Sequence, residues 1–363
     1  MSTRLLSLGL RITPIALAFA IAAAVFALAG FDVIEILGGT VEGSITGRGS
    51  AANTLRWSIP LILIGVGVAV SLRTGEFNIG GQGQFLMGQC AAVWVGLQLD
   101  MAMPWLFVVA TLLAVLAGAV WSAIAGVLKV AFGADEVITT LMLNFVALQF
   151  VQWVTTGALA DPLTSGDAAS TARLAPEVRL QGSGEISVVL VTLTVVVAAL
   201  VLVLVERTSL GVGFKIVGAN PTAAAWQGLP VTRIRLASYA VSGGLAGLAG
   251  AAEVFGPAGR VVTGATPTLG FTALVVATVA SLAIVGTVVA GLFFGALQAA
   301  IVYLPIVSDL PPSGLRIIEG LVALLMTAQL ATVMRSRGWL GAGSDPDPGS
   351  ASGSPSGTAG GDA

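Results

Sequence analysis

Three short stretches of this sequence place polar side chains in surroundings that are otherwise apolar. The first spans residues 73–85, where four glycines and the amides of Asn78, Gln82 and Gln84 interrupt an apolar context. Glycine weakens a helix by roughly 1 kcal/mol relative to alanine. Two interpretations stay open: a non-helical segment at membrane depth that lines a cavity, or a turn between two helices. In the first interpretation the three amides would face a polar solute.

The second stretch, residues 134–144, begins with two acids and ends with an amide. Asp135 and Glu136 stand where carboxylates complement the dipole at a helix N-terminus. Thr140 and Asn144 are four residues apart, so they share one face of the same helix. A buried asparagine in a membrane helix either bonds a neighbouring helix or faces a solute path. Helix bonding is slightly favoured for a lone asparagine.

The third stretch contains a short helix with its own start and stop. Asn220 is a good N-cap, and Pro221 suits the first helical position. Gly228 ends the helix after less than two turns, and the helix carries Trp226. Because so short a helix is marginal alone, it requires a partner surface. The alternative is a connector that lies on the bilayer surface.

Several kinds of chemistry find no support in the residues. The chain has no histidine, which excludes His-based metal sites and triads, and its only cysteine, Cys90, sits in an apolar run and is expected to pack. No G-x-x-x-x-G-K-[ST] motif is present, so a P-loop for ATP is not expected in this chain. No clustered nucleophile and base suggest an enzyme, and no close set of intramembrane acids suggests a proton pathway.

Composition places the chain in a membrane. Of its 363 residues 56% are hydrophobic and only 9% are charged, against about 25% charged in a soluble domain. The apolar runs are too long and too continuous for barrel strands, so the predicted spans are helices. The net charge of −2 and the lack of a basic block give no sign of nucleic-acid binding.

Charge-free runs predict about ten transmembrane helices, since each crossing needs about 20 residues. The runs are 12–31, 57–72, 77–99, 101–128, 137–160, 186–205, 236–252, 261–308 and 317–334, the last of which contains one charged residue, Glu319. The 48-residue run 261–308 is too long for one crossing, so we divide it near residues 281–286. Ten spans place both termini on one side, and the excess of Lys and Arg on that side predicts cytoplasmic termini. Residues 12–31 could instead be a cleaved signal peptide, but a retained span is favoured.

These three stretches resemble one family, the permeases of ABC importers for simple sugars, branched-chain amino acids and nucleosides. Residues 75–85 are similar to its FNIG-x-x-GQ stretch, 136–144 to EVI-x-T-x-MLN, and 217–228 to VG-x-NP-x-AA. The Gly- and Ala-rich residues 242–253 follow as in the family. The resemblance covers about residues 51–335. One departure stands at 278–286, where the polar turn usual in the family is absent.

The resemblance implies a transmembrane permease subunit that is not itself an enzyme, in the cell membrane with lipid around it. Its expected partners are an ABC ATPase that binds ATP and Mg, a second permease and an extracytoplasmic substrate-binding lipoprotein. The expected organisation is a cytoplasmic N-terminus (1–11), a permease domain (12–335) and a disordered cytoplasmic tail (336–363). Residues 206–235 form the expected coupling segment. Within it, the residues predicted to couple to the ATPase are Asn220, Pro221, Ala224, Trp226 and Gly228.

The FNIG form favours nucleosides as the solute, with a simple sugar such as a pentose as the alternative. A less favoured alternative of another class is an ion-coupled secondary transporter. Polarity at membrane depth, together with the motif match, predicts that Asn78, Gln82, Gln84 and Asn144 contribute to the solute path.

Overall fold

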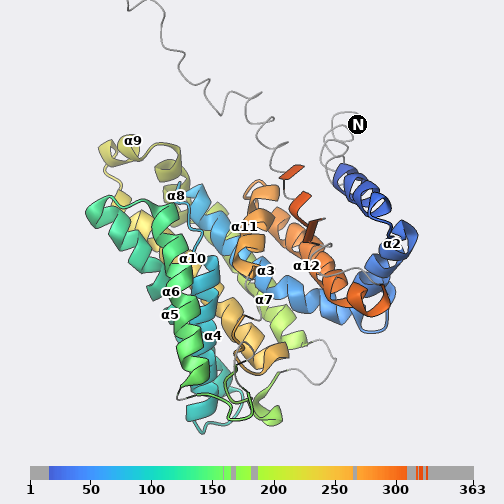
Figure 1. The fold of residues 1–363 in the computed structure, drawn as a ribbon. Helices are drawn as coiled ribbons and strands as arrows, with labels where there is room; N and C mark the ends of the chain where they lie inside the picture. Colours follow the sequence, from blue (N-terminus) through green and yellow to red (C-terminus); the bar gives the residue numbers. More distant parts are fainter. Residues whose placement is uncertain are drawn as a thin grey trace, which may run out of the picture.

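The computed structural model describes residues 16–157, 159–164, 169–180, 187–264, 268–308, 316–317, 319–321 and 324–325. The predicted N-terminus 1–11 and tail 336–363 lie outside these residues. The described chain is built of helices, and its only β features are two isolated bridges. The all-α prediction is therefore confirmed (Figure 1).

The helices follow the predicted runs closely. They are a helix at Ala16–Leu28, α2 (Val33–Val41), η1 (Glu42–Thr46), α3 (Ser50–Arg73), α4 (Gly81–Gln98), α5 (Trp105–Phe132), α6 (Glu136–Thr156), η3 (Pro176–Val178), α7 (Val188–Arg207), α8 (Ser209–Ala219), α9 (Pro221–Trp226), α10 (Val231–Glu253), η4 (Val254–Ala258), α11 (Leu269–Val279) and α12 (Ile284–Val307). Five of them, α3, α5, α6, α7 and α12, are long and apolar enough to cross a membrane. The count of ten spans and the side of the termini stay predictions.

The long apolar run is broken where the sequence predicted a turn. Helix α11 ends at Val279 and α12 begins at Ile284, so the division near 281–286 is confirmed. Ser281 and Leu282 between them have φ angles of 52° and 61°. This left-handed region is uncommon for residues other than glycine. The turn is thus made without the polar, glycine-containing sequence that is usual in the family.

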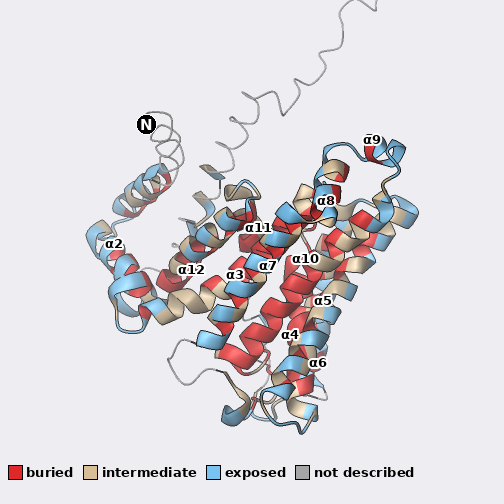
Figure 2. Cartoon of the chain, turned by 180° about the vertical axis from the view of Figure 1, so that it is seen from behind, coloured by how far each residue is buried: buried red, intermediate tan, exposed pale blue. Residues whose placement is uncertain are grey.

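Helix α10 lies at the centre of the bundle, packed against α3, α4 and α5. Figure 2 shows α4 and α10 largely buried, whereas α5 and α6 carry exposed outer faces. Small residues bring α5 and α10 together: a Cβ on Gly118 would lie 2.2 Å from the carbonyl oxygen of Gly243. Small residues four apart, Gly118 and Ser122 in α5 and Gly243 and Gly247 in α10, thus allow close contact between these two helices.

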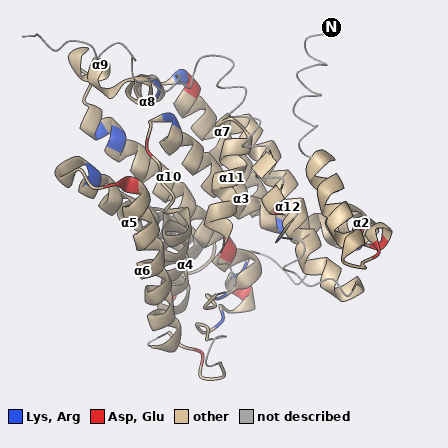
Figure 3. Cartoon of the chain, turned by 45° about the horizontal axis from the view of Figure 1, so that its top comes forward, with Lys and Arg blue, Asp and Glu red and all other residues tan. Residues whose placement is uncertain are grey.

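The two ends of the bundle differ. One end, here called the α9 end, holds α8, α9, the last residue of α3 and the start of α10. In Figure 3 several ribbon positions there are blue, the colour of Lys and Arg. At the other end, here called the opposite end, loop residues 169–180 lie against residues 255–263. The backbone bonds Thr171 N to Val261 O (2.9 Å) and Leu174 N to Gly259 O (2.8 Å) join these two loops.

Candidate functional site

The polar stretch at 73–85 forms a connection between two helices and the first turn of the second helix. Residues 74–80 are non-helical and connect α3 to α4, and the first turn of α4 begins at Gly81. The amides of this stretch are nonetheless buried: Asn78 in the connection, and Gln82 and Gln84 in the first turn of α4. We call these three amides and that of Asn144 the amide cluster. Buried amides must be paired, so their partners define what the cluster does.

Asn78 joins three helices at one point. Its amide nitrogen lies 3.0 Å from Ser242 Oγ in α10 and 3.3 Å from Ser122 Oγ in α5. Its carbonyl oxygen accepts from Gln84 Nε2 (2.8 Å) and from the backbone N–H of Gly80 (3.0 Å). Both serines sit beside the glycines that bring α5 and α10 into contact, so the close approach and the polar contact depend on each other.

Asn144 and Gln82 bond the backbone of other segments. The Asn144 carbonyl oxygen accepts from Gly83 N (2.8 Å), and its amide donates to the carbonyl oxygen of Ile79 (3.0 Å). Gln82 Oε1 accepts from Gly270 N, at the start of α11, over 2.8 Å. The four predicted site residues are thus brought together around one segment, and each holds protein partners. Whether they also contribute to a solute path stays a prediction.

A buried carboxylate beside the cluster was missed in the sequence. Glu76 is 0% exposed and lies 2.7 Å from Lys129 Nζ in α5. Arg235 Nε in α10 lies 2.8 Å from the other carboxylate oxygen, Oε1, whereas the Tyr239 hydroxyl donates over 3.2 Å to Oε2, the oxygen that also faces Lys129. The Arg235 contact is an ion pair rather than a linear hydrogen bond, since Arg235 Nε has no hydrogen-bond acceptor. One acid in a glycine-rich stretch was the only sequence signal.

Helix α9 forms as its sequence predicts. Asn220 Oδ1 accepts from Ala223 N over 2.9 Å, Pro221 occupies the first position, and Gly228 follows with a φ of 80°. Trp226 is 88% exposed. Ala224, in contrast, is fully buried within the chain. Of the residues predicted to couple, Ala224 thus faces the chain itself, while Trp226 projects from the molecule.

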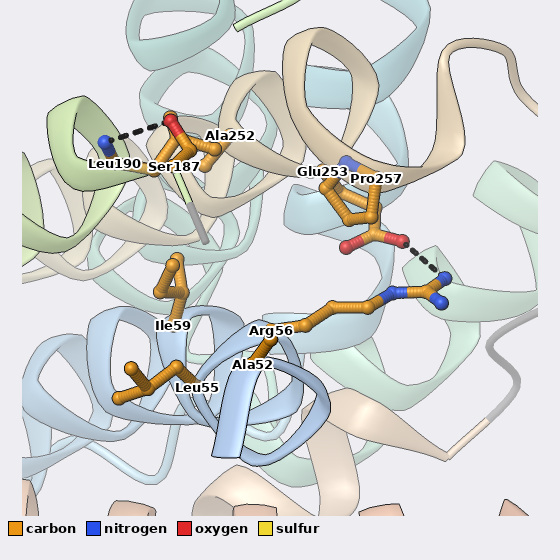
Figure 4. A pocket seen from close by; sticks show the side chains of 9 residues that line it. All are labelled: Ala52, Leu55, Arg56, Ile59, Ser187, Leu190, Ala252, Glu253 and Pro257. Carbon is orange, nitrogen blue, oxygen red and sulfur yellow. Dashed lines mark hydrogen bonds and ion pairs between the residues drawn. The ribbon is translucent and has the colours of Figure 1, made fainter. Parts of the chain in front are cut away.

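The opposite end carries ionic groups of its own. Figure 4 shows Arg56 of α3 reaching Glu253 at the end of α10; their charged atoms are 3.6 Å apart, beside a cavity of about 10 Å³. That volume corresponds to about one water molecule. Arg173 and Arg179 both lie over Gly259, where a Cβ would come within 3.3 Å of either Nε atom. Burial, and secondly the charge of Arg173, lower the pKa of the Arg179 guanidinium from its ordinary value.

A larger cavity opens between α4, α5 and α6. It has a volume of about 810 Å³, and we call it the aromatic groove. Its lining includes Trp94, Gln98, Phe150 and Trp153, and the rings of Phe150 and Trp153 are 5.6 Å apart. Among the described residues, no cluster of three or more His, Cys, Asp or Glu side chains could hold a metal ion.

Comparison with known proteins identifies the family of this chain. Residues 50–328 match the family described as "Branched-chain amino acid transport system / permease component". The chain belongs to this family. It is 30% identical to the guanosine ABC transporter permease protein NupP of Bacillus subtilis, over 91% of this chain and 96% of that protein. It is 31% identical to the nucleoside permease NupB of Lactococcus lactis, over 69% of this chain and 71% of NupB.

A third relative points to a different solute. The glucose ABC transporter permease protein TsgB13 of Haloferax volcanii is 30% identical, over 88% of this chain and 87% of that protein. No solved structure matches the chain. The resemblance seen in the sequence motifs is confirmed at the level of the permease family.

Proposed function

We propose that this chain is a permease subunit of an ATP-driven importer in the cell membrane, and that the importer takes up nucleosides. Two nucleoside-named relatives, NupP and NupB, support the solute class. The glucose-named relative supports a simple sugar as the second candidate. The observation that carries the ATP-driven part is α9, a capped helix whose Trp226 projects from the bundle.

An ATPase subunit is the proposed partner of α9. A helix of six residues is too short to be stable alone, and here it rests on its own chain through the buried Ala224. A large exposed aromatic side chain such as Trp226 is typical of an anchor in a protein interface. ATP and Mg would be bound by the ATPase, and this chain would contribute the surface that the ATPase moves.

The α9 end is proposed to be cytoplasmic, in a bundle of about ten spans with both termini on that side. Both lysines of the chain lie at this end, together with Arg73, Arg207, Arg233 and Arg235. Basic residues of this kind favour a cytoplasmic side. Single cysteines at two exposed alanines test the orientation, in a Cys90→Ser background. Ala175→Cys at the opposite end should react with an impermeant thiol reagent from outside, and Ala225→Cys in α9 should not. Equal labelling of both from outside would overturn the topology.

The second permease is proposed to be a different chain. Bacillus subtilis has two relatives named as guanosine permeases, NupP and NupQ, at 30% and 27% identity. Lactococcus lactis has the nucleoside permeases NupB and NupC, at 31% and 25%. In both organisms one member is more similar to this chain than the other. We expect affinity-tagged chain to co-purify with a non-identical permease, and a tagged and an untagged copy of this chain not to co-purify.

The extracytoplasmic binding protein is proposed to dock at the opposite end. Arg173, Arg179 and Arg260 lie there on the two joined loops, and none has an ion-pair partner among the described residues. Such arginines suit carboxylates on a partner, which steer association in a salt-dependent way. Arg173→Glu should therefore slow association and reduce its salt dependence.

The solute path has two sets of candidates. Each amide of the cluster is bonded to groups of the protein, so we propose that the cluster shapes the wall of the path. The aromatic groove supplies what a nucleobase needs: exposed rings for stacking, in Trp94 and Trp153, and the amide of Gln98. Trp94→Ala should raise the KM for uptake, whereas Asn144→Ala should lower the amount of folded protein. A normal KM in both Trp94→Ala and Trp153→Ala would remove the groove from the path.

The experiment that tests the whole proposal is reconstitution. The chain, its co-purified permease and ATPase, and the binding protein are placed in vesicles, and uptake of labelled guanosine is followed with and without ATP. Uptake that requires ATP and is blocked by unlabelled nucleosides supports the proposal. Competition by glucose or pentoses but not by nucleosides favours the sugar alternative. Uptake driven by an ion gradient without ATP would overturn the mechanism.

A further inference from the structure

The last residue of α3 connects two parts of the α9 end that are far apart in sequence. Arg73 Nη1 lies 2.7 Å from Glu206 Oε1, near the end of α7. The other oxygen of Glu206 lies 2.7 Å from Lys215 Nζ in α8. Arg73 also donates from Nε to the carbonyl oxygen of Leu282, in the turn between α11 and α12, over 2.9 Å. We call Arg73, Glu206, Lys215 and the Leu282 carbonyl the Arg73 junction.

Backbone contact reinforces the junction. A Cβ on Gly218 would lie 2.1 Å from the carbonyl oxygen of Arg73, so the end of α8 touches the end of α3 directly. Only glycine permits this approach. Gly218 stands two residues before Asn220, the N-cap of α9. A displacement of α9 therefore reaches Arg73 through one short, contiguous set of contacts.

The residues that follow Arg73 lead into the polar interior. Segment 74–80 contains Glu76 and Asn78, whose partners lie in α5 and α10. The segment thus begins at the Arg73 junction and continues into the buried ion pairs of Glu76 and the buried amide contacts of Asn78. A non-helical connection between two fixed points is where a bundle can absorb a rigid-body shift of one element.

We propose that Arg73 and Glu206 are positioning residues that transmit movement of α9 to segment 74–80. This inference rests on the proposed function, in which an ATPase moves α9. The carboxylate of Glu206 is 38% exposed, and exposed ion pairs contribute little to stability. The pair therefore acts on the placement of α3 relative to α7 and, through Lys215, to α8, rather than on folding.

The decisive test separates transport from assembly. In the reconstituted complex, Arg73→Ala and Glu206→Ala are each compared with wild type for solute moved per ATP hydrolysed. Each variant should lower the amount of solute moved per ATP by about fivefold or more. Fivefold is the lower end of the factors by which coupled sites typically affect each other. The double variant should lose less than the two single losses combined, because both single variants remove the same Arg73–Glu206 contact. Arg207→Ala is the matched control, since Arg207 is the exposed neighbour of Glu206 and forms no ion pair within the described residues.

A charge exchange guards against a merely structural explanation. Arg73→Glu combined with Glu206→Arg restores an ion pair at the same place, and should recover part of the ratio lost in Arg73→Glu alone. An unchanged ratio in both alanine variants, or losses that add in the double variant, would overturn the inference. If wild-type complex shows no ATP-dependent uptake, the proposed function fails instead, and the two failures are thereby distinguished.

Discussion

The amide cluster and helix α9 match family motifs equally well, yet the fold uses them in opposite ways. The cluster is buried and bonded within the chain: Asn78 reaches serines on two other helices, and Asn144 bonds the backbone of its neighbour. Helix α9 keeps one small side chain inside, Ala224, and directs Trp226 outward. A motif of polar residues can thus encode internal architecture, while a motif with little polarity can place a large side chain on the surface.

This contrast makes a prediction about energy. Changes in and around the cluster should reduce the stability of the isolated chain, whereas changes on the outer side of α9 should leave stability intact and affect only the complex. The following variants test it, in decreasing order of their expected effect on stability.

Glu76→Ala should have the largest effect. It removes the buried counter-ion of Arg235 and leaves Lys129 paired with Glu136 alone, and breaking a buried ion pair typically costs about 3–5 kcal/mol. The free energy of unfolding in detergent micelles, from denaturant titration, should fall by that amount. Glu206→Ala is the control, since its exposed ion pairs contribute about 0–1 kcal/mol. Equal effects of the two variants would mean that burial at Glu76 does not matter.

Gly243→Ala should rank next. The added methyl would meet the carbonyl oxygen of Gly118, with a Cβ distance of 2.3 Å, and would push α10 away from α5. Such overpacking costs about 1–3 kcal/mol. Because Ser122 and Ser242 would separate, the bonds of Asn78 should weaken with it. Gly38→Ala is the matched control, since nothing lies within 4 Å of a Cβ at that helical glycine. A stable Gly243→Ala variant would show that close contact is not what supports the cluster.

Asn144→Ala should follow. It leaves the buried N–H of Gly83 and the carbonyl oxygen of Ile79 without their partner, and an unsatisfied buried group costs about 1–3 kcal/mol. The same denaturant titration measures the loss. Gln152→Ala, an exposed amide on the same helix, should be within about 0.5 kcal/mol of wild type. If Asn144→Ala were as stable as wild type but failed in uptake, the amide would belong to the solute path.

Features that depend on residues close together in the sequence could be predicted, whereas features that depend on residues far apart in the sequence could not. The start of α9 depends on Asn220 and Pro221, which are adjacent, and the break between α11 and α12 was placed from run length alone. The partners of the cluster are not local: Asn78 and Ser242 are 164 residues apart, and Gln82 and Gly270 are 188 apart. No periodicity in a single sequence specifies such pairs.

Besides the distant partners, the local sequence pattern could not predict how deeply the polar side chains are buried. The sequence suggested Asn78 and Gln84 as groups facing a solute, because amides in an apolar context are costly unless paired or functional. Their pairing depends on how closely α5 and α10 approach, which depends in turn on glycines of both helices. Glu76 illustrates the same point, since its counter-ions Lys129 and Arg235 lie in two other helices.

The smallest effect on stability is expected for Trp226→Ala, and it tests the contrast most directly. The side chain is 88% exposed, so the free energy of unfolding should change by less than about 0.5 kcal/mol. In the complex the same change removes the one large apolar side chain that α9 presents, and truncating such an anchor typically costs about 2 kcal/mol or more of binding free energy. Co-purification of the ATPase should therefore fall steeply while the yield of folded permease stays constant. Trp105→Ala provides the matched control, since Trp105 is also exposed but lies at the opposite end, at the start of α5. Normal ATPase binding by Trp226→Ala would show that α9 is a connector on the membrane surface. Helix α9 and the amide cluster would then differ only in how far their side chains are buried, and no partner would account for the exposure of Trp226.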